Sequence, residues 1–298
     1  MHPYLSDRWV SLKHRAYSSW FRNPQSERLF KASKTQLDEV QQKVLRELCE
    51  NGVALVHFDE LFGDRQLWTI LSRAADEFVS GPQVRDGLES WAKDGRKSVK
   101  KKRYLVRLYP ENPLVEPDDL WLGLGVDARI VGVVNSYLGL FAKLSGFEVW
   151  YTIADTQERR PIGSQNWHRD PEDRKMVKVF LYCSDVTEGC GPLEYVRQSR
   201  DGERNCHTSY NGTAWRGSGE DIVHVASEDI VTATGRKGTL AFCDTAGLHR
   251  GGYAVDAPRV LAKWIFSTPA SLHPRRFKMV DKKLAFDSAA ARFAITCP

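Results

Sequence analysis

The feature that most limits the fold is a change of pattern near the middle of the chain. Before about residue 145, apolar residues recur at helical spacing, as in residues 35–50 and 62–79. Beyond that point the chain divides into short strand-like segments, several of them separated by Gly and Pro, at residues 147–153, 175–182, 192–196, 229–233, 239–243 and 259–267. Many short strands after a helical first half predict a mainly β fold with α-helices. We expect a double-stranded β-helix (a jelly roll, cupin-like) buttressed by N-terminal helices.

The length of 298 residues suits one large domain or two small ones. We expect an N-terminal arm at 1–34 and a single domain at 35–298, with helical support mostly in 35–145 and the jelly-roll core at about 146–270. Thr35 or Ser33 is the expected cap of the helix at 35–50, which ends at Asn51-Gly52. The remaining expected elements are helices at 62–79 and 127–144 and strands at 53–56 and 103–109. Residues 81–102 form a polar, charged segment that closes in a basic run at 96–103.

Composition excludes several classes of protein. Hydrophobic residues make up 42% and charged residues 27%, as in a soluble globular protein. The net charge of +5 is too small to indicate nucleic-acid binding. No apolar run approaches the ~18 residues of a membrane span, and the N-terminus lacks a signal-peptide core, although its basic, serine-containing composition also fits a transit peptide. The six cysteines have no CxxC spacing, which favours free thiols and a cytoplasmic location over a zinc site built from Cys183, Cys190, Cys206 and His207.

A short motif carries the chemistry. His168-x-Asp170 places an imidazole and a carboxylate two residues apart, and on an extended strand such residues point the same way. A second histidine, His249, follows far downstream. Two histidines and one carboxylate can occupy one face of an octahedral metal and leave the other face open, as in non-haem Fe(II) oxygenases. Each residue alone also suits a plain structural role, so the pattern depends on the three together.

Arg259 follows His249 by about ten residues and begins a largely apolar strand. A strand, a turn and the next strand would return its guanidinium to the metal. A buried arginine needs an anionic partner, and its planar fork grips a carboxylate with two parallel hydrogen bonds. The alternative is an internal salt bridge, for example to Asp256.

The ordered set of His168, Asp170, His249 and Arg259 resembles that of the Fe(II)/2-oxoglutarate-dependent oxygenases, and most closely the phytanoyl-CoA dioxygenase-like family. The resemblance covers residues 147–268 and, more faintly, the strand near 52–58. It implies Fe(II) bound by the two histidines and Asp170 as the catalytic centre, with 2-oxoglutarate and dioxygen as co-substrates. It also implies that Arg259 binds 2-oxoglutarate, and that Gln165, three residues before His168, contacts it. Thr239 is a further candidate contact, because Gly251 stands where the family often has Ser.

The resemblance also bears on the reaction. Halogenating relatives carry a small residue at the carboxylate position, so the presence of Asp170 implies hydroxylation or another oxidation. The family's Pro-Gly-Ser-His segment is replaced by Arg197-Gln198-Ser199-Arg200, at the start of the irregular segment 197–225. Long irregular segments are often functional lids. The departure falls where the substrate loop should begin, so substrates of relatives do not transfer to this chain.

Three functions are compatible with the residues. The first is a dioxygenase that oxidises, and most simply hydroxylates, a C–H bond of a small molecule. The second is a macromolecule hydroxylase or demethylase, supported by the basic run at 96–103, although no recognisable nucleic-acid-binding module accompanies it. The third is a non-catalytic jelly-roll binding protein.

Other residues could contact a substrate. Arg103 and Arg107 share one face of a strand and suit either an anionic substrate or a solvated sheet edge. Either Trp150 or Tyr151, on the strand before the His-x-Asp motif, should face the cavity.

Overall fold

The computed structural model describes residues 22–93, 104–155, 163–207, 209–210, 222–223, 225–281, 286 and 288–297. Its centre is a six-stranded antiparallel sheet, here the main sheet. In spatial order its strands are β1 (Val53–His57), β10 (Thr239–Cys243), β5 (Val177–Tyr182), β12 (Arg259–Ser267), β4 (Lys143–Thr152) and β2 (Leu105–Arg107).

A three-stranded antiparallel sheet, here the minor sheet, has the order β11 (His249–Gly251), β6 (Leu193–Val196) and β9 (Ile230–Ala233). Two short pairs complete the described strands: β3 (Leu114–Val115) with β13 (Lys278–Met279), and β7 (Ser209–Tyr210) with β8 (Ile222–Val223). The fold is therefore a mixture of α-helices and mostly antiparallel β-sheets.

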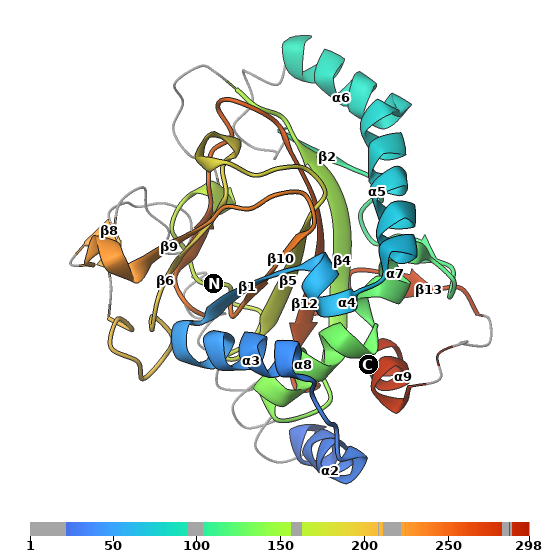
Figure 1. Ribbon diagram of the computed structural model, residues 1–298, viewed down its shortest axis with the longest axis vertical. Helices are drawn as coiled ribbons and strands as arrows, with labels where there is room; N and C mark the ends of the chain where they lie inside the picture. The colour runs from blue at the N-terminus through green and yellow to red at the C-terminus, as the bar shows by residue number, and fades with distance from the viewer. Residues whose placement is uncertain are drawn as a thin grey trace, which may run out of the picture.

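Helices cover one face of the main sheet, as Figure 1 shows for α3, α5, α7 and α8. The described helices are α2 (Asn23–Ser33), α3 (Glu39–Asn51), α4 (Phe58–Phe62), α5 (Arg65–Ser80), α6 (Pro82–Lys93), α7 (Leu120–Gly125), α8 (Ala128–Leu138) and α9 (Ala289–Thr296). Apolar side chains of these helices and of the covered sheet face form one continuous core. Burial of this apolar surface is the main force that holds the two layers together.

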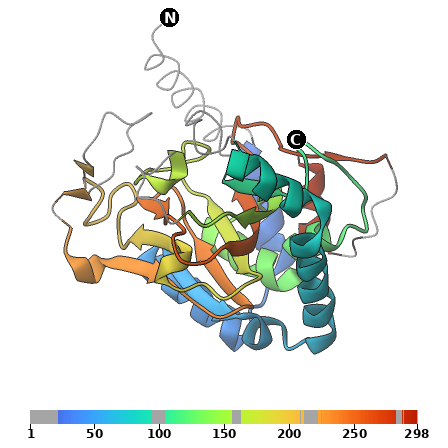
Figure 2. The same ribbon diagram turned by 90° about the horizontal axis from the view of Figure 1, so that it is seen from above.

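The minor sheet packs on the other face of the main sheet, on the side away from α5 (Figures 1 and 2). Val53 and Ala241 of the main sheet pack there against Leu193 of the minor sheet. The hydroxyl of Tyr182 bridges the two sheets by donating to the carbonyl of Ala233 at 2.6 Å. The face of the main sheet that looks toward the minor sheet is called the inner face below.

Strand β12 shows how the sequence divides its residues between the two faces. All nine of its residues are buried. Val260, Ala262 and Trp264 point into the helix-covered core, so the alternate residues Arg259 and Lys263 belong to the inner face. A strand buried on both faces reads as an almost continuous apolar run, which is why its two cations stand out.

Most of the predicted elements are present, and three differ. The helix expected at 127–144 ends at Leu138, because Gly139 adopts a left-handed φ of 75° and β4 then begins at Lys143. The polar segment at 81–102, for which no element is predicted, contains α6, which begins at Pro82, a residue that suits the first turn of a helix. Helix α3 is capped by Asp38 in a capping box with Gln41, and not by Thr35 or Ser33.

The expected arm at 1–34 contains a helix in its described part. The Ser26 hydroxyl of α2 donates to the carbonyl of Phe141 at 2.7 Å, and Ala270 N donates to Asn23 Oδ1 at 3.1 Å. Residues 1–21 lie outside the described part of the chain. Among the described helices, none is long and apolar enough to cross a membrane.

Trp264 is fully buried, and its indole N–H donates to the carbonyl of Trp121 at 2.7 Å. Trp264→Ala should lower the free energy of unfolding by about 3–5 kcal/mol, because it removes that bond and opens a cavity. Urea denaturation would measure the loss. Leu114→Ala, at a side chain that is 69% exposed, serves as the control and should stay within about 0.5 kcal/mol of the parent. A loss of under 1 kcal/mol for Trp264→Ala would contradict the expectation.

Candidate metal centre

The structure brings His168, Asp170 and His249 together. His168 and His249 form a β-bridge, in which His168 N donates to His249 O at 2.9 Å and His249 N donates to His168 O at 3.0 Å. Nε2 of His249 lies 3.4 Å from Asp170 Oδ2, and Nε2 of His168 lies 3.8 Å from Asp170 Oδ1. One potential ligand atom from each of the three residues lies within 4.8 Å of the others. In the described part of the chain this is the one such group of three histidine, cysteine or acidic residues.

Backbone carbonyls orient both imidazoles. Nδ1 of His168 lies 2.8 Å from Asn166 O, and Nδ1 of His249 lies 3.0 Å from Gly247 O. A carbonyl only accepts, so each Nδ1 carries the proton and each Nε2 keeps its lone pair for a metal. Burial, together with the neighbouring His249, lowers the pKa of His168 to about 3. His168 is therefore neutral near pH 7, as metal ligation requires.

The turn before His249 is anchored at several points. Asp170 N donates to Thr245 O at 2.9 Å, which joins this turn to the His-x-Asp segment. The buried carboxylate of Asp244 accepts from the Tyr137 hydroxyl at 2.5 Å and from Ala246 N at 3.1 Å. Burial raises the pKa of Asp244 while these hydrogen bonds oppose the rise.

Tyr195 fills the space behind the same turn. A Cβ on Gly247 would lie 2.0 Å from the Tyr195 hydroxyl oxygen, and one on Gly52 would lie 2.2 Å from it. The tyrosine ring is fully buried between the two glycines. Glycine is therefore required at both positions by close contact with this ring.

Lys178 of β5 is a neighbour that sequence reasoning missed. Its Nζ lies 2.5 Å from Asp170 Oδ2 and 3.8 Å from Glu172 Oε1, and only 9% of its side chain is exposed. Burial alone would raise the pKa of Asp170, but Lys178 and the two histidines hold it well below its usual range. The signal was available, because a lysine in the otherwise apolar strand Val177–Tyr182 needs a buried partner.

Arg259 is buried at the start of β12, and its Nε has no hydrogen-bond partner. No ion pair joins it to Asp256 or to any other carboxylate of the described residues, so the alternative of an internal salt bridge is not seen. A Cβ built on Gly251 would lie 3.9 Å from Arg259 Nη2, which places the guanidinium beside β11, two residues after His249. Burial lowers the pKa of Arg259, and nearby Tyr182 and Tyr104 oppose the shift.

The two secondary contacts expected for 2-oxoglutarate have different surroundings. Gln165 is buried in the 3-10 helix Gly163–Gln165, which packs against β11. Thr239 is buried on β10, and β5 separates that strand from β12, so the structure does not bring Thr239 next to Arg259. Thr152 pairs with Arg259 in the β4–β12 register, and its buried hydroxyl has no hydrogen-bond partner. Sequence reasoning could not select Thr152 without that register.

The inner face carries further charge beyond Lys178. Nζ of Lys263 lies 2.6 Å from Glu148 Oε2 and 4.5 Å from the centre of the Trp150 ring. Arg107 Nε lies 3.9 Å from Glu148 Oε1. Burial would raise the pKa of Glu148, yet Lys263 and Arg107 lower it to about 2. Burial lowers the pKa of Lys263 to about 8, and Glu148 opposes that shift.

The segment expected to act as a lid is held down in its described first part. Arg169 donates to Ser199 O at 3.2 Å and to Cys206 O at 3.1 Å. Leu248 N donates to the Ser199 hydroxyl at 2.7 Å. Gln198 stands where the family has Gly, and it adopts a left-handed φ of 52°, which glycine adopts more easily. Residues 197–200 therefore form a turn although they depart from the family's Pro-Gly-Ser-His segment. Residues 211–220 lie outside the described residues, and so does the basic run at 96–103.

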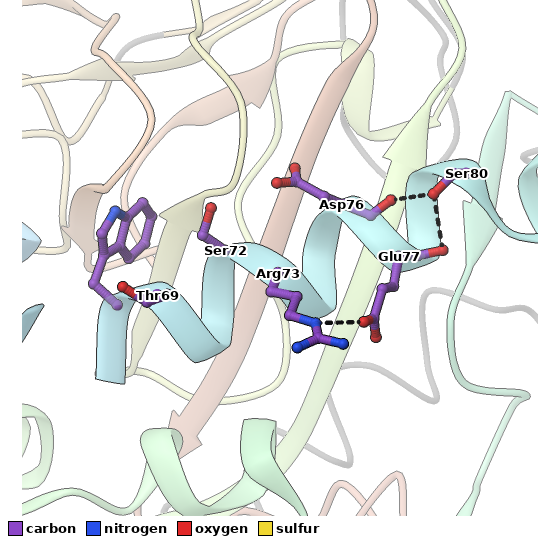
Figure 3. A pocket seen from close by; sticks show the side chains of 7 residues that line it. Thr69, Ser72, Arg73, Asp76, Glu77 and Ser80 are labelled. Atoms are coloured by element: carbon purple, nitrogen blue, oxygen red, sulfur yellow. Dashed lines mark hydrogen bonds and ion pairs between the residues drawn. The ribbon is translucent and has the colours of Figure 1, made fainter. Parts of the chain in front are cut away.

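A hollow along the outside of α5 is not part of this centre (Figure 3). It is lined by residues of that one helix, from Trp68 to Ser80. Its charges are already paired, Arg73 with Glu77 at 2.8 Å and Asp76 with Lys237 at 2.9 Å.

All six cysteines are free thiols. The residues of the zinc alternative, which are Cys183, Cys190, Cys206 and His207, form no ligand cluster among the described residues.

No family model matches the chain, and no curated protein matches it. Among solved structures, EctD from S. alaskensis with 2-oxoglutarate and 5-hydroxyectoine is 16% identical at a TM-score of 0.49, over 86% of each chain. The epimerase SnoN with Fe3+, alpha ketoglutarate and nogalamycin RO is 11% identical at 0.47, over 79% of this chain and 86% of that one. The alpha ketoglutarate-dependent carbocyclase SnoK is 13% identical at 0.44, over 84% and 95%.

At such identities and TM-scores, only the chain's own residues can indicate its chemistry.

The Glu148–Lys263 pair gives a pH-dependent prediction. Because the pKa of Glu148 falls from 4.5 to about 2 on folding, its contribution to stability is complete above pH 4.5 and is lost as the pH falls toward 2. Glu148→Gln should cost about 3 kcal/mol at pH 7, since it leaves Lys263 buried without its partner. Urea unfolding at several pH values should show the difference from the parent shrinking below pH 4.5. Exposed Glu77→Gln is the control, and a pH-independent difference for Glu148→Gln would contradict the assignment.

Proposed function

We propose that this protein is a non-haem Fe(II)/2-oxoglutarate-dependent dioxygenase that oxidises, and most simply hydroxylates, a C–H bond of a small molecule. The observation that carries the proposal is the joint position of two sites. His168, Asp170 and His249 offer converging ligand atoms, and the partnerless cation Arg259 lies beside the strand that contains His249. Neither site alone would indicate a 2-oxo acid as co-substrate.

The three residues fit Fe(II). Two neutral imidazoles and one carboxylate are the donor set that non-haem iron prefers, and one charge of the ion is neutralised by Asp170. Asp170 Oδ2 accepts from Lys178 Nζ, and Nδ1 of each imidazole donates to a backbone carbonyl. All three side chains are therefore oriented without the metal. Such orientation by neighbouring groups supports ligand affinity and geometry.

The surroundings of Arg259 fit the distal carboxylate of 2-oxoglutarate. A buried guanidinium without an anion is costly, and a carboxylate would accept from its unpaired Nε. The hydroxyl of Thr152, also without a partner, lies across the register from it and can donate to the same anion. Both groups are orphaned in the protein alone, so the cradle is suited to a ligand.

At such a centre, oxidative decarboxylation of 2-oxoglutarate drives the use of dioxygen to oxidise a substrate C–H bond. The chain contributes position and shielding. His168, Asp170 and His249 would hold the ion, and Arg259 would bind and orient the co-substrate. The minor sheet packs on the inner face and Tyr182 bridges the two sheets, which would limit the access of water to the centre.

Within this proposal the two facing sheets form a double-stranded β-helix, and residues 35–298 form one oxygenase domain. A small-molecule substrate is favoured because the described charges converge on the enclosed inner face. The macromolecule hydroxylase depends on the basic run at 96–103, outside the described residues. The non-catalytic binding protein would leave Lys178, Asp170 and both imidazoles without a chemical reason to converge.

Anaerobic addition of Fe(II) and 2-oxoglutarate should produce a metal-to-ligand charge-transfer band in the visible. Asp170→Ala and His249→Ala should abolish it, because each removes one of three protein ligands. His273→Ala is the matched control, since the described hydrogen bonds at that residue are made by its backbone. Absence of the band in the parent protein would favour the non-catalytic binding protein.

Arg259→Ala should weaken 2-oxoglutarate binding by about 10- to 100-fold, since it removes a charge-assisted, two-point contact. Arg259→Lys should fall between, because a lysine retains the charge but loses the planar fork. Titration of the charge-transfer band measures both values, and exposed Arg236→Ala is the control. Unchanged 2-oxoglutarate affinity in Arg259→Ala would refute this role.

A further inference from the structure

Two buried donors stand opposite each other at the edge of the inner face, and neither has an acceptor. Arg107 of β2 and Trp150 of β4 are register partners. In an antiparallel pair, residues directly opposite each other project from the same face with Cβ atoms about 5 Å apart. Arg107 Nε and Trp150 Nε1 are both buried without a hydrogen-bond partner. Orphaned buried donors are rare in folded proteins and indicate a missing acceptor.

The charges on this face point to a negatively charged acceptor. Glu148 gives its close contact to Lys263, at 2.6 Å, and lies 3.9 Å from Arg107, beyond hydrogen-bonding distance. Lys178 is paired with Asp170 at 2.5 Å. Among the described inner-face cations outside the Arg259 cradle, Arg107 is therefore the least compensated.

The 2-oxoglutarate cradle does not account for Arg107. Arg259 lies on β12 and Arg107 on β2, and β4 separates the two strands. Two strand spacings of ~4.8 Å place them about 10 Å apart. In register, Arg107 is paired with the unpartnered Trp150 N–H and Arg259 with the unpartnered Thr152 hydroxyl, so the inner face carries two donor pairs that can each receive an anion.

We propose that Arg107 and Trp150 bind an oxyanion group of the substrate, a carboxylate or a phosphate. This inference rests on the proposed function and specifies its substrate class as a small anionic molecule. Lys178, which contacts Asp170, lies on β5. Strand β5 is separated from β2 by three strand spacings, or about 14 Å. A substrate held at Arg107 and oxidised near Asp170 is therefore of metabolite size.

The test is a thermal-shift titration with inorganic phosphate, benzoate and benzamide at constant ionic strength, with and without Fe(II) and saturating 2-oxoglutarate under anaerobic conditions. The parent protein should show a saturable rise in Tm with phosphate or benzoate and none with benzamide, the neutral counterpart of benzoate. The preferred anion distinguishes a phosphate from a carboxylate. Arg107→Gln should raise the half-saturating concentration by about ten-fold or more, because it removes the charged donor.

Trp150→Phe keeps an aromatic ring but removes the part of the indole that carries the N–H, so it should weaken anion binding several-fold. Arg73→Gln, on the outside of α5, is the matched control and should respond like the parent. If Arg107→Gln does not fold, Arg107→Lys, which keeps the charge but not the fork, decides the matter together with Trp150→Phe. No saturable response of the parent to either anion, an equal response to benzamide, or undiminished binding in the Arg107 and Trp150 variants would overturn the proposal.

The charge-transfer band separates this outcome from the proposed function. Arg107→Gln should retain the band, whereas Arg259→Ala should need more 2-oxoglutarate to produce it and should still bind the anion probe. An absent band with intact anion binding would reject the iron chemistry alone. A normal band without anion binding would reject the substrate class alone.

Discussion

The two backbone hydrogen bonds between His168 and His249 are the constraint on which the rest of the centre depends. They join the segment before β5 to β11, an edge strand of the minor sheet. Residues far apart in the chain therefore lie close together. Asp170 is tied to the same place by its N–H bond to Thr245. Once the backbone is fixed in this way, each imidazole needs only a carbonyl on Nδ1 to point its other nitrogen inward.

The inner face combines sheet packing with a high density of buried charge. Strands that are apolar toward the helices carry Lys178, Glu148 and Lys263 toward the other side. Buried charges rarely add net stability, because desolvation offsets their attraction. Their concentration beside three potential metal ligands is better explained by ligand binding than by folding. The unpaired donors of Arg259 and Arg107 agree with that explanation.

The sequence predicted six of the strands that lie between residues 147 and 267, because their apolar runs and turn residues are strong local signals, but not the short strand β11. It also selected His168, Asp170, His249 and Arg259 by type and order. It missed what depends on register, such as the proximity of Thr152 to Arg259, and what depends on tertiary pairing, such as Lys178 beside Asp170. It placed Thr239 near Arg259 because the strand order, with β5 between them, was not available from local pattern.

Tyr195 connects the turn before His249 to a segment near the N-terminal end of the chain. Its ring touches both Gly52, at the end of α3, and Gly247, whose carbonyl orients an imidazole. In homologous proteins, a side chain at either glycine would have to be accompanied by a smaller residue at position 195. These three positions should therefore vary as a set, and helix α3 and the turn before His249 would diverge together.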